Sequence, residues 1–317
     1  MAPSPSAEAR RLRFRRSLRL ALVALALLAP PQAFAGTLYV STSQGYLFEV
    51  DRATAESTQI GVYALSDPES GREFKGLAAT PDGSRLYTTY ERWFVGGGRV
   101  HAVETSAVAI DPATATASEL PPFDAEELGM ALPEDVREGI GFGPIAISPT
   151  NPGVGVVIGQ DFDWDSLNTI PYLWSFDLVT GSPLGPAVRL ESPLLALTFT
   201  PDGSALLGTR LAPGNRSTLV TVDPTSGSLD VVGQLPRYYN ALAFDEDGTL
   251  FAASGYELST LDPATGAVLV SRTLLPAGPP LGLPTGLAFI ANPEPSTALL
   301  LGLGLTGLAA RRRRRGR

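Results

Sequence analysis

Between residues 36 and 291 the chain alternates short apolar runs with turns rich in Asp, Pro and Gly. One recurring segment is an apolar strand that ends in Asp, followed by a turn and a second strand. It occurs as YLFEVDRATAEST (Asp51), AVAIDPATATASE (Asp111), LWSFDLVTGSPLG (Asp177), LVTVDPTSGSLDV (Asp223) and LSTLDPATGAVLV (Asp262). Asp opens such turns through its side chain, Pro presets φ, and Gly supplies a positive φ. The pattern therefore predicts a series of β-hairpins.

A second recurring segment is an apolar strand, a turn of the Pro-Asp-Gly kind and a further strand. It occurs as GLAATPDGSRLYTT, IAISPTNPGVGVVIG, LALTFTPDGSALLGT and ALAFDEDGTLFAAS. One hairpin of each kind makes a four-stranded antiparallel blade, so the body is predicted to be an all-β propeller. Successive Asp turns lie 60, 66, 46 and 39 residues apart, against the ~40–50 residues of a typical blade. We expect five blades, while residues 91–99 and 121–140 leave room for a sixth or seventh.

The last repeat unit lacks one strand. After Asp262 the chain reaches TGLAFIAN (residues 285–292), and no closing strand follows. The missing strand is available near the other end of the chain, as GTLYVSTS (residues 36–43). A blade built from both ends would close the ring and remove an exposed sheet edge. We therefore expect residues 37–42 to pair with residues 285–290.

The repeats over residues 36–291 resemble the NHL, YVTN and quinoprotein-type propeller repeats in their short hairpins and Asp-Gly turns. The resemblance implies one propeller domain over this range. In propeller lactonases and quinoproteins, carboxylate, Asn or His side chains converge on the central channel. No such set can be assigned residue by residue from this sequence.

Residues 1–35 have the parts of a secretory signal. The first 19 residues are rich in Arg, and an apolar stretch runs from Leu18 to Ala29. About 12 apolar residues are short for a membrane span, which needs ~20. Ala33 and Ala35 form an Ala-x-Ala site, so we expect cleavage after Ala35 during export through the secretion translocon. An uncleaved membrane anchor is the alternative.

Residues 292–317 read NPEPSTALLLGLGLTGLAARRRRRGR. Pro293, Glu294 and Pro295 disfavour helix and favour an extended, accessible segment. A single transmembrane helix is expected over residues 296–310, about 22 Å long at 1.5 Å per residue. The Arg cluster over residues 311–317 then follows, with Arg311, Arg312, Arg313, Arg314 and Arg315 in an unbroken run. By the positive-inside rule this cluster stays cytoplasmic and the preceding residues lie outside.

This tail resembles the PEP-CTERM sorting signal of Gram-negative bacteria, which consists of a Pro-Glu-Pro sequence, a short transmembrane helix and a terminal Arg cluster. The resemblance implies that an exosortase-like membrane enzyme recognises Pro293, Glu294 and Pro295 and processes the chain near them. The protein would pass through an inner-membrane intermediate, held by its C-terminal helix, and then reach the cell surface or the extracellular space. Many bacteria with this signal build exopolysaccharide or a biofilm matrix. An ordinary tail anchor is the alternative.

The charge of the chain is segregated. Of the 24 Lys and Arg residues, 12 lie in the two terminal segments, and of the 32 acidic residues only Glu8 lies outside residues 36–310. That stretch therefore has 12 basic and 31 acidic residues, a formal charge of −19. Such a body repels nucleic acid, which excludes it as a partner. The chain has no Cys, so disulfides, thiolate metal sites and a cysteine nucleophile are also excluded.

The densest carboxylate cluster is DFDWDSLN, which contains Asp161, Asp163 and Asp165. Carboxylates at alternate positions are typical of the opening of a calcium loop. The rest of the calcium-loop template fails, because Ser166 stands where Gly is needed and Tyr172 where the bidentate Glu is needed. The cluster therefore allows a calcium site, and a plain acidic loop or strand edge is the alternative.

Two classes of function are compatible with this sequence. His101 is the single histidine, and no Gly-x-Ser-x-Gly elbow accompanies it for a Ser-His-Asp triad. We therefore expect a non-catalytic envelope or matrix protein whose propeller binds polysaccharide or an envelope protein and needs no cofactor. The alternative is an exported propeller hydrolase or oxidoreductase, lactonase-like or quinoprotein-like. The central channel discriminates between them, since three or more converging carboxylate, Asn or His side chains would favour the enzyme.

Overall fold

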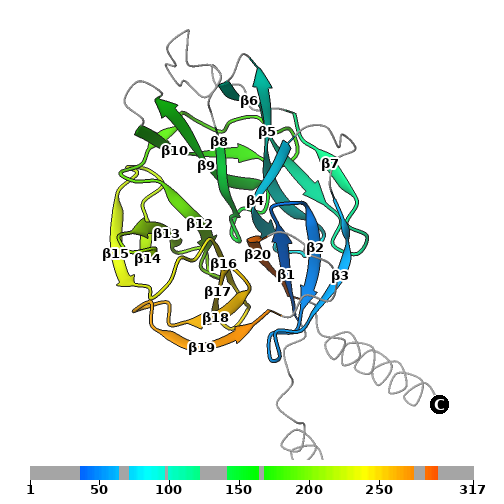
Figure 1. Cartoon of the computed structure of the whole chain (residues 1–317), viewed down its shortest axis with the longest axis vertical. Coiled ribbons are helices and arrows are strands. Elements are labelled where there is room, and N and C mark those ends of the chain that lie inside the picture. The colour runs from blue at the N-terminus through cyan, green and yellow to red at the C-terminus, as the bar shows by residue number, and fades with distance from the viewer. Residues whose placement is uncertain are drawn as a thin grey trace, which may run out of the picture. The chain divides into compact units, whose positions relative to one another are not determined.

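The computed structural model describes residues 36–63, 71–96, 99–121, 141–163, 168–274 and 283–291. These residues form five four-stranded antiparallel sheets, arranged as blades around a common axis (Figure 1). The five-bladed, all-β propeller predicted from the repeats is therefore confirmed. Residues 36–292 make up one compact unit.

Each blade runs from an inner strand beside the axis to an outer strand at the rim. The closing blade consists of β20 (Pro284–Ile290), β1 (Thr37–Thr42), β2 (Tyr46–Val50) and β3 (Ser57–Val62). The second blade consists of β4 (Gly71–Ala79), β5 (Leu86–Gly96), β6 (Arg99–Ile110) and β7 (Ala117–Glu119). The third consists of β8 (Gly141–Ile147), β9 (Val154–Asp163), β10 (Asn168–Asp177) and β11 (Val188–Arg189). The fourth and fifth are β12 (Leu194–Phe199), β13 (Leu206–Ala212), β14 (Arg216–Val222) and β15 (Leu229–Gln234), then β16 (Ala241–Phe244), β17 (Leu250–Ser254), β18 (Glu257–Leu261) and β19 (Val268–Thr273).

The hydrophobic core is divided into five clusters, one between each pair of neighbouring blades. Successive side chains of a strand point to opposite faces of its sheet, so both faces of every blade contribute to a cluster. The middle strands are therefore apolar on both faces. In β17, which reads LFAAS, the first four residues are buried. Trp174, the largest fully buried side chain, fills the cluster between the second and third blades.

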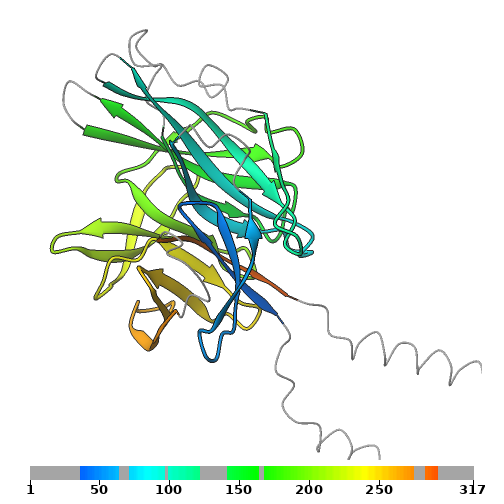
Figure 2. The ribbon, with the colours of Figure 1, turned by 45° about the vertical axis from the view of Figure 1, so that its right-hand side comes forward.

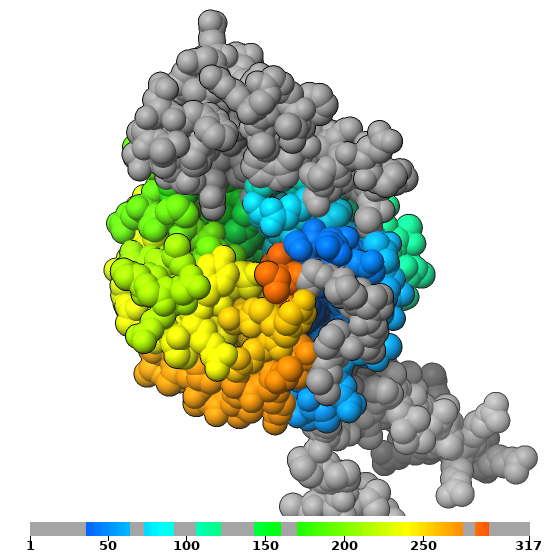
Figure 3. Space-filling view, viewed as in Figure 1, coloured from blue at the N-terminus to red at the C-terminus, as the bar shows by residue number. Residues whose placement is uncertain are grey.

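The ring is closed by the pairing of strands from the two ends of the propeller. β1 is antiparallel to β20, with Thr37 opposite Ile290 and Thr42 opposite Pro284. This confirms the predicted pairing of residues 37–42 with residues 285–290. In the space-filling view the atoms of β20 lie in the middle of the ring, between the fifth blade and the closing blade (Figure 3).

The extra residues of the second and third blades lengthen their hairpins. Residues 91–96 and Arg99 belong to the long β5–β6 hairpin, and β9 and β10 form a similar one (Figure 2). No α-helix occurs among the residues that the structure describes, and thus none that is long and apolar enough to cross a membrane. The expected signal peptide, transmembrane helix and Arg cluster lie outside the described residues, as do residues 122–140 of the stretch that left room for a further blade.

The Asp turns join the third and fourth strands of every blade, and their carboxylates hold the turn together. The Asp51 Oδ1 atom accepts hydrogen bonds from the N–H groups of Ala53 and Thr54, at 2.7 and 2.8 Å. The N–H of Ala55 then donates to the carbonyl of Asp51, and Ala55 has a φ of 61°. The other four blades repeat this pattern, with positive φ at Ala115, Gly181, Gly227 and Gly266. The repeated Asp is therefore a structural residue.

The fifth residue of each Asp turn contacts the preceding blade. Ala115 of the second blade lies against Gly61 on β3, where a Cβ added to that glycine would come within 2.9 Å of the Ala115 Cβ. Gly227 of the fourth blade lies against the carbonyl of Arg189 on β11. The corresponding contacts of the third, fifth and closing blades join Gly181 to Pro121, Gly266 to Leu235, and Ala55 to the core that contains Leu274. The Asp turns that recur in the sequence therefore form contacts between each blade and the preceding one.

Acid is expected to weaken the fold by protonating the Asp carboxylates of two kinds of turn. One kind is the Asp turns, and the other is the inner turns, which join the first and second strands of a blade. The Thr200 hydroxyl, followed by the N–H and hydroxyl of Ser204, lowers the pKa of Asp202 to about 2. Backbone N–H groups, Thr54 first, likewise lower the pKa of Asp51. Because the unfolded chain binds these protons more readily, the stabilisation is complete above the ordinary value of 3.8 and is lost as the pH falls toward about 2. Urea unfolding at pH 5, 4, 3 and 2.5 measures this loss.

The variant Asp202→Asn should show a flatter dependence of the free energy of unfolding on pH below 4 than the parent protein, because one of the titrating carboxyl groups is gone. The matched control is Asp230→Asn, at an exposed position on β15, which should keep the dependence of the parent. Equal slopes for the parent and Asp202→Asn would show that this turn carboxylate does not link folding to pH.

Candidate functional site

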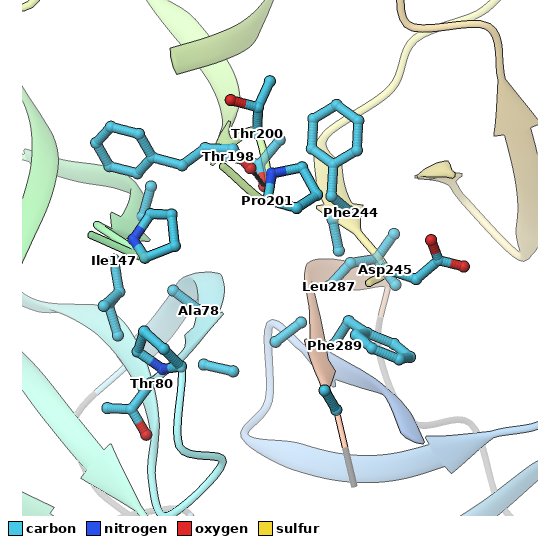
Figure 4. Close-up of a pocket in the computed structure, with 18 of the residues that line it drawn as sticks. Ala78, Thr80, Ile147, Thr198, Thr200, Pro201, Phe244, Asp245, Leu287 and Phe289 are labelled. Carbon is cyan, nitrogen blue, oxygen red and sulfur yellow. Dashed lines mark hydrogen bonds between the residues drawn. The ribbon is translucent and has the colours of Figure 1, made fainter. Parts of the chain in front are cut away.

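A pocket of about 340 Å³ opens at one end of the propeller axis. It is built from the last residues of all five inner strands, β4, β8, β12, β16 and β20, and from the turns that follow four of them (Figure 4). Because the inner strand of each blade is the first strand of an antiparallel meander, the inner turns and the Asp turns lie at this same end. We call this opening the axial pocket.

Most of the side chains that line the axial pocket are apolar. Phe199, Phe244 and Phe289 reach it from three different blades, and each is half-buried because it also packs against an interblade core. Ala, Ile, Leu and Pro side chains fill most of the remaining wall, and Figure 4 shows Ala78, Ile147, Leu287 and Pro201 among them. Such a wall suits an apolar or ring-shaped group bound by a few polar contacts.

The inner strands add backbone hydrogen-bonding groups to the pocket. Each of them is the edge strand of its sheet, so the N–H and C=O groups on its axial side make no ladder bond within the blade. The N–H and C=O groups of the two middle strands of a blade pair with a strand on either side, and those of the outer strand at the rim pair on one side only. The axial pocket therefore combines apolar side chains with backbone donors and acceptors from five chain segments.

The polar side chains of the pocket are mostly engaged within the protein. The Thr80 hydroxyl donates to the carbonyl of Arg85, at 3.2 Å, and the Thr200 hydroxyl donates to Asp202, at 2.7 Å. Both hydroxyls thus stabilise inner turns. Thr198, on β12, lies close to Thr200 (Figure 4), and its hydroxyl donates to the carbonyl of Phe199, at 3.4 Å.

Two carboxylates, Asp245 and Glu246, lie on one side of the axial pocket. Asp245 is only 4% exposed and accepts a hydrogen bond from Arg52 of the closing blade, at 2.8 Å. The same Arg52 guanidinium lies 4.9 Å above the centre of the Phe289 ring and 3.8 Å from the Glu246 carboxylate. Burial raises the pKa of Glu246. One arginine therefore ties the closing blade to the fifth blade beside the pocket.

Replacement of Arg52 by Ala should destabilise the propeller by about 2 kcal/mol, because it leaves the buried Asp245 carboxylate without its cation. The matched control is Arg272→Ala on the exposed outer strand β19, which should change the free energy of unfolding by less than about 0.5 kcal/mol. Urea unfolding of the two variants makes the comparison. Equal losses for both variants would mean that the Arg52–Asp245 pair contributes no more than an ordinary surface arginine.

The residues suggested by the sequence as metal ligands lie elsewhere. Asp161 and Asp163 are at the end of β9, opposite Ile170 and Asn168 of β10, and this end of the hairpin is remote from the inner turn that opens β9. Asp165 lies outside the described residues. Among the residues that the structure describes, no cluster of three His, Asp or Glu side chains could hold a metal ion. The calcium site stays a prediction.

His101 is on β6, opposite Phe94 of β5 in the long hairpin. The residues expected for signal cleavage, Ala33 and Ala35, and those expected for sorting lie outside the described residues, namely Pro293, Glu294, Pro295, Arg311, Arg312, Arg313, Arg314 and Arg315. The last described residue is Ala291, which is exposed and lines the mouth of the axial pocket.

The axial pocket and the Arg52–Asp245 pair were not predicted from the sequence. Phe199 and Phe244 both directly precede an inner turn, so an aromatic residue at the end of an inner strand was the signal available for the pocket wall. No comparable signal exists for Arg52. Its partner is 193 positions away along the chain, and only the closed ring brings the two together.

Comparison with known proteins identifies the C-terminal segment. Residues 293–315 match the family model of the PEP-CTERM protein-sorting motif. The described part of the chain is thus an all-β, five-bladed propeller, and a PEP-CTERM sorting motif follows it in the sequence. That motif indicates export, a membrane-anchored sorting signal, and processing by an exosortase, a membrane enzyme.

Two solved structures illustrate what this chain is similar to. TolB from Acinetobacter baumannii is 13% identical, with 84% of this chain and 69% of that chain covered at a TM-score of 0.42. The periplasmic gluconolactonase PpgL from Pseudomonas aeruginosa is 15% identical, with 81% of this chain and 99% of that chain covered at a TM-score of 0.40. No curated protein matches the chain.

Proposed function

We propose that this protein is a non-catalytic binding platform of the cell envelope or extracellular matrix, and that its ligand binds in the axial pocket. One observation carries the proposal. All five inner strands contribute to the pocket, yet its lining side chains are apolar apart from three threonines and two adjacent carboxylates. Fewer than three carboxylate, Asn or His side chains from different blades converge among the described lining residues.

Catalysis would need a nucleophile or a general acid–base pair aimed at one reacting atom. The lining hydroxyls of Thr80 and Thr200 are bonded within their own turns, and that of Thr198 donates to the carbonyl of Phe199. The pocket has no His or Lys among its described lining residues. Asp245 is held by Arg52 and by the N–H groups of Asp247 and Thr249. This leaves Glu246 as a single carboxylate without a second group to work with.

The ligand class that fits this wall best is a neutral or basic polysaccharide. The apolar faces of sugar rings pack on aromatic side chains such as Phe199 and Phe244, and their hydroxyls can bond to the backbone edges of the inner strands. The body carries a formal charge of −19 over residues 36–310, which repels strongly anionic polymers. An exopolysaccharide or biofilm context agrees with this ligand class.

The route of the protein completes the proposal. The signal over residues 1–35 is removed after Ala35, and the C-terminal helix over residues 296–310 holds an inner-membrane intermediate in a Gram-negative cell. The exosortase then processes the chain near Pro293, and the propeller reaches the cell surface or the extracellular space. The two terminal segments thus direct export and sorting, and the propeller binds the ligand.

The test uses the exported protein and the exopolysaccharide fraction of the same bacterial culture, in a co-sedimentation assay. Phe199→Leu and Phe244→Leu keep an apolar side chain but remove the ring, and each should weaken binding about fivefold, the effect of losing ~1 kcal/mol of aromatic contact. The control is Tyr256→Leu, because Tyr256 is 48% exposed in the β17–β18 turn, at the other end of the ring.

Two results would overturn the proposal. One is binding that Phe199→Leu and Phe244→Leu leave unchanged while melting temperatures show that both variants are folded. The other is turnover of a lactone or glycoside by the exported protein that Glu246→Gln abolishes, which would establish the propeller as an enzyme. Binding to an envelope protein in place of the polysaccharide fraction would also refute the ligand class proposed here.

A further inference from the structure

The sorting motif begins almost at the end of the folded propeller. β20 ends at Ile290, which is buried, and the motif matched by the family model starts at Pro293. Only Ala291 and Asn292 lie between them. In the other four blades the inner strand is followed by a turn into the second strand, but in the closing blade β1 already occupies the second place. After β20 the chain therefore leaves the blade at the position where the other four inner strands lead into a turn.

Chain geometry limits how far the motif reaches from the ring. The Cα atoms of Ile290 and Pro293 are three residues apart, which allows at most about 11 Å even when fully extended. Ala291 lines the mouth of the axial pocket. An enzyme that engages the Pro-Glu-Pro segment must therefore approach the end of the propeller that carries the inner turns. Steric contact with that end is unavoidable for a folded enzyme domain.

We propose that this end of the propeller is a docking surface for the exosortase. We define this sorting face by five exposed residues of the inner turns and the chain exit, which are Pro81, Thr150, Pro201, Asp247 and Ala291. The proposal rests on the sorting motif and on the two-residue connection, and it does not depend on what the axial pocket binds. The sorting face thus acts while the exosortase processes the precursor, before the exported protein binds any ligand.

The charge of the sorting face indicates what its partner surface must offer. Asp82, Asp202 and Asp247 lie in the inner turns, and five Asp turns surround them at the same end of the ring. Asp82 and Asp202 are ionised at neutral pH, since hydrogen bonds from Thr80 and Thr200 lower the pKa of their carboxyl groups. An anionic bilayer surface repels such a face. A docking surface on the enzyme should therefore be positive or rich in hydrogen-bond donors.

The experiment measures processing of the full-length precursor in the producing bacterium, by pulse-chase labelling and immunoblot. The variant Asp247→Arg reverses one exposed charge on the sorting face. Processing should slow about threefold, the size of effect expected from the loss of one surface charge contact. The matched control is Glu73→Arg, the same charge reversal at an exposed residue near the start of β4, at the opposite end of the inner strands. It should process at the parental rate.

A spacer variant distinguishes lost docking at the sorting face from other causes of slower processing. Twelve Gly and Ser residues inserted after Ala291 give the motif a mean reach of about 19 Å more, so that the enzyme can engage it away from the ring. In this background Asp247→Arg and the parent should be processed at equal rates. The melting temperature of each propeller variant, released by truncation after Asn292, shows whether the charge reversal has disturbed the fold.

Three results would overturn the proposal. Asp247→Arg and Glu73→Arg could both be processed at the parental rate at the native spacing, which would show that the enzyme gains nothing from contact with the sorting face. The slowing could persist in the spacer background, which would place its cause outside the contact at the ring. Faster processing of Asp247→Arg would indicate instead that the face lies against the anionic membrane. None of these results bears on ligand binding in the axial pocket, so the two proposals fail separately.

Discussion

Deletion of residues 36–45 from the exported protein is expected to abolish the native ring. The deletion removes β1, so β20 loses its partner in the closing blade. It also removes Leu38 and Val40, which are buried in the core between the closing and fifth blades. Each large buried side chain contributes about 2–5 kcal/mol, so these two alone account for about 4–10 kcal/mol, which is comparable to the whole stability of an ordinary domain. Size-exclusion chromatography and near-ultraviolet circular dichroism should show aggregated, loosely packed protein.

The control keeps the same residues and changes only their connection. A circular permutant joins Ile290 to Thr37 through the turn sequence Thr-Pro-Asp-Gly-Ser, which serves in two of the other blades. Its new ends replace the exposed β13–β14 turn at Gly214. This protein should be monomeric and should melt near the parent. A deletion variant that stays monomeric with parental melting would contradict the role of β1 in closing the ring.

The variant Gly233→Ala should destabilise the propeller by about 3 kcal/mol, the upper range for a forced overlap in a packed interior. Gly233 lies on β15, and a Cβ at this position would overlap the carbonyl of Thr265 in the Asp turn of the fifth blade. Because both overlapping groups are backbone, no side-chain rotation relieves the contact, and the two blades must separate. Urea unfolding measures the loss.

The matched control for Gly233→Ala is Gly185→Ala, since a Cβ at Gly185 would have no atom within 4 Å. It should be neutral, or slightly stabilising through the reduced freedom of the unfolded chain. A loss for Gly233→Ala no larger than that of Gly185→Ala would show that the fourth and fifth blades can slide apart freely at this contact.

The parts of the fold that depend on local chemistry could be predicted from the sequence. The side chains of Asp51 and Asp111 bond to the N–H groups two and three residues later, so these turns need nothing beyond their own five residues. The closure of the ring followed from counting strands, because the unit after Asp262 lacked one. Both inferences rest on patterns that recur at a regular spacing along the chain.

The axial pocket depends on the closed ring and could not be predicted in this way. Phe199, Phe244 and Phe289 meet around one axis only because five inner strands are brought side by side. Arg52 looks like any surface arginine of an Asp turn until the closing blade places it beside Asp245.

The pairing of β1 with β20 has a consequence in time. The two strands are about 250 residues apart along the chain, and synthesis proceeds at about 5–20 residues per second. β1 therefore waits for roughly 13 to 50 seconds with an open edge before its partner exists. The sorting motif starts three residues after the end of that partner, so it reaches the membrane at nearly the moment when the ring can first close. Any factor that shields a waiting strand edge during export would raise the yield of this protein more than that of a propeller closed by neighbouring strands.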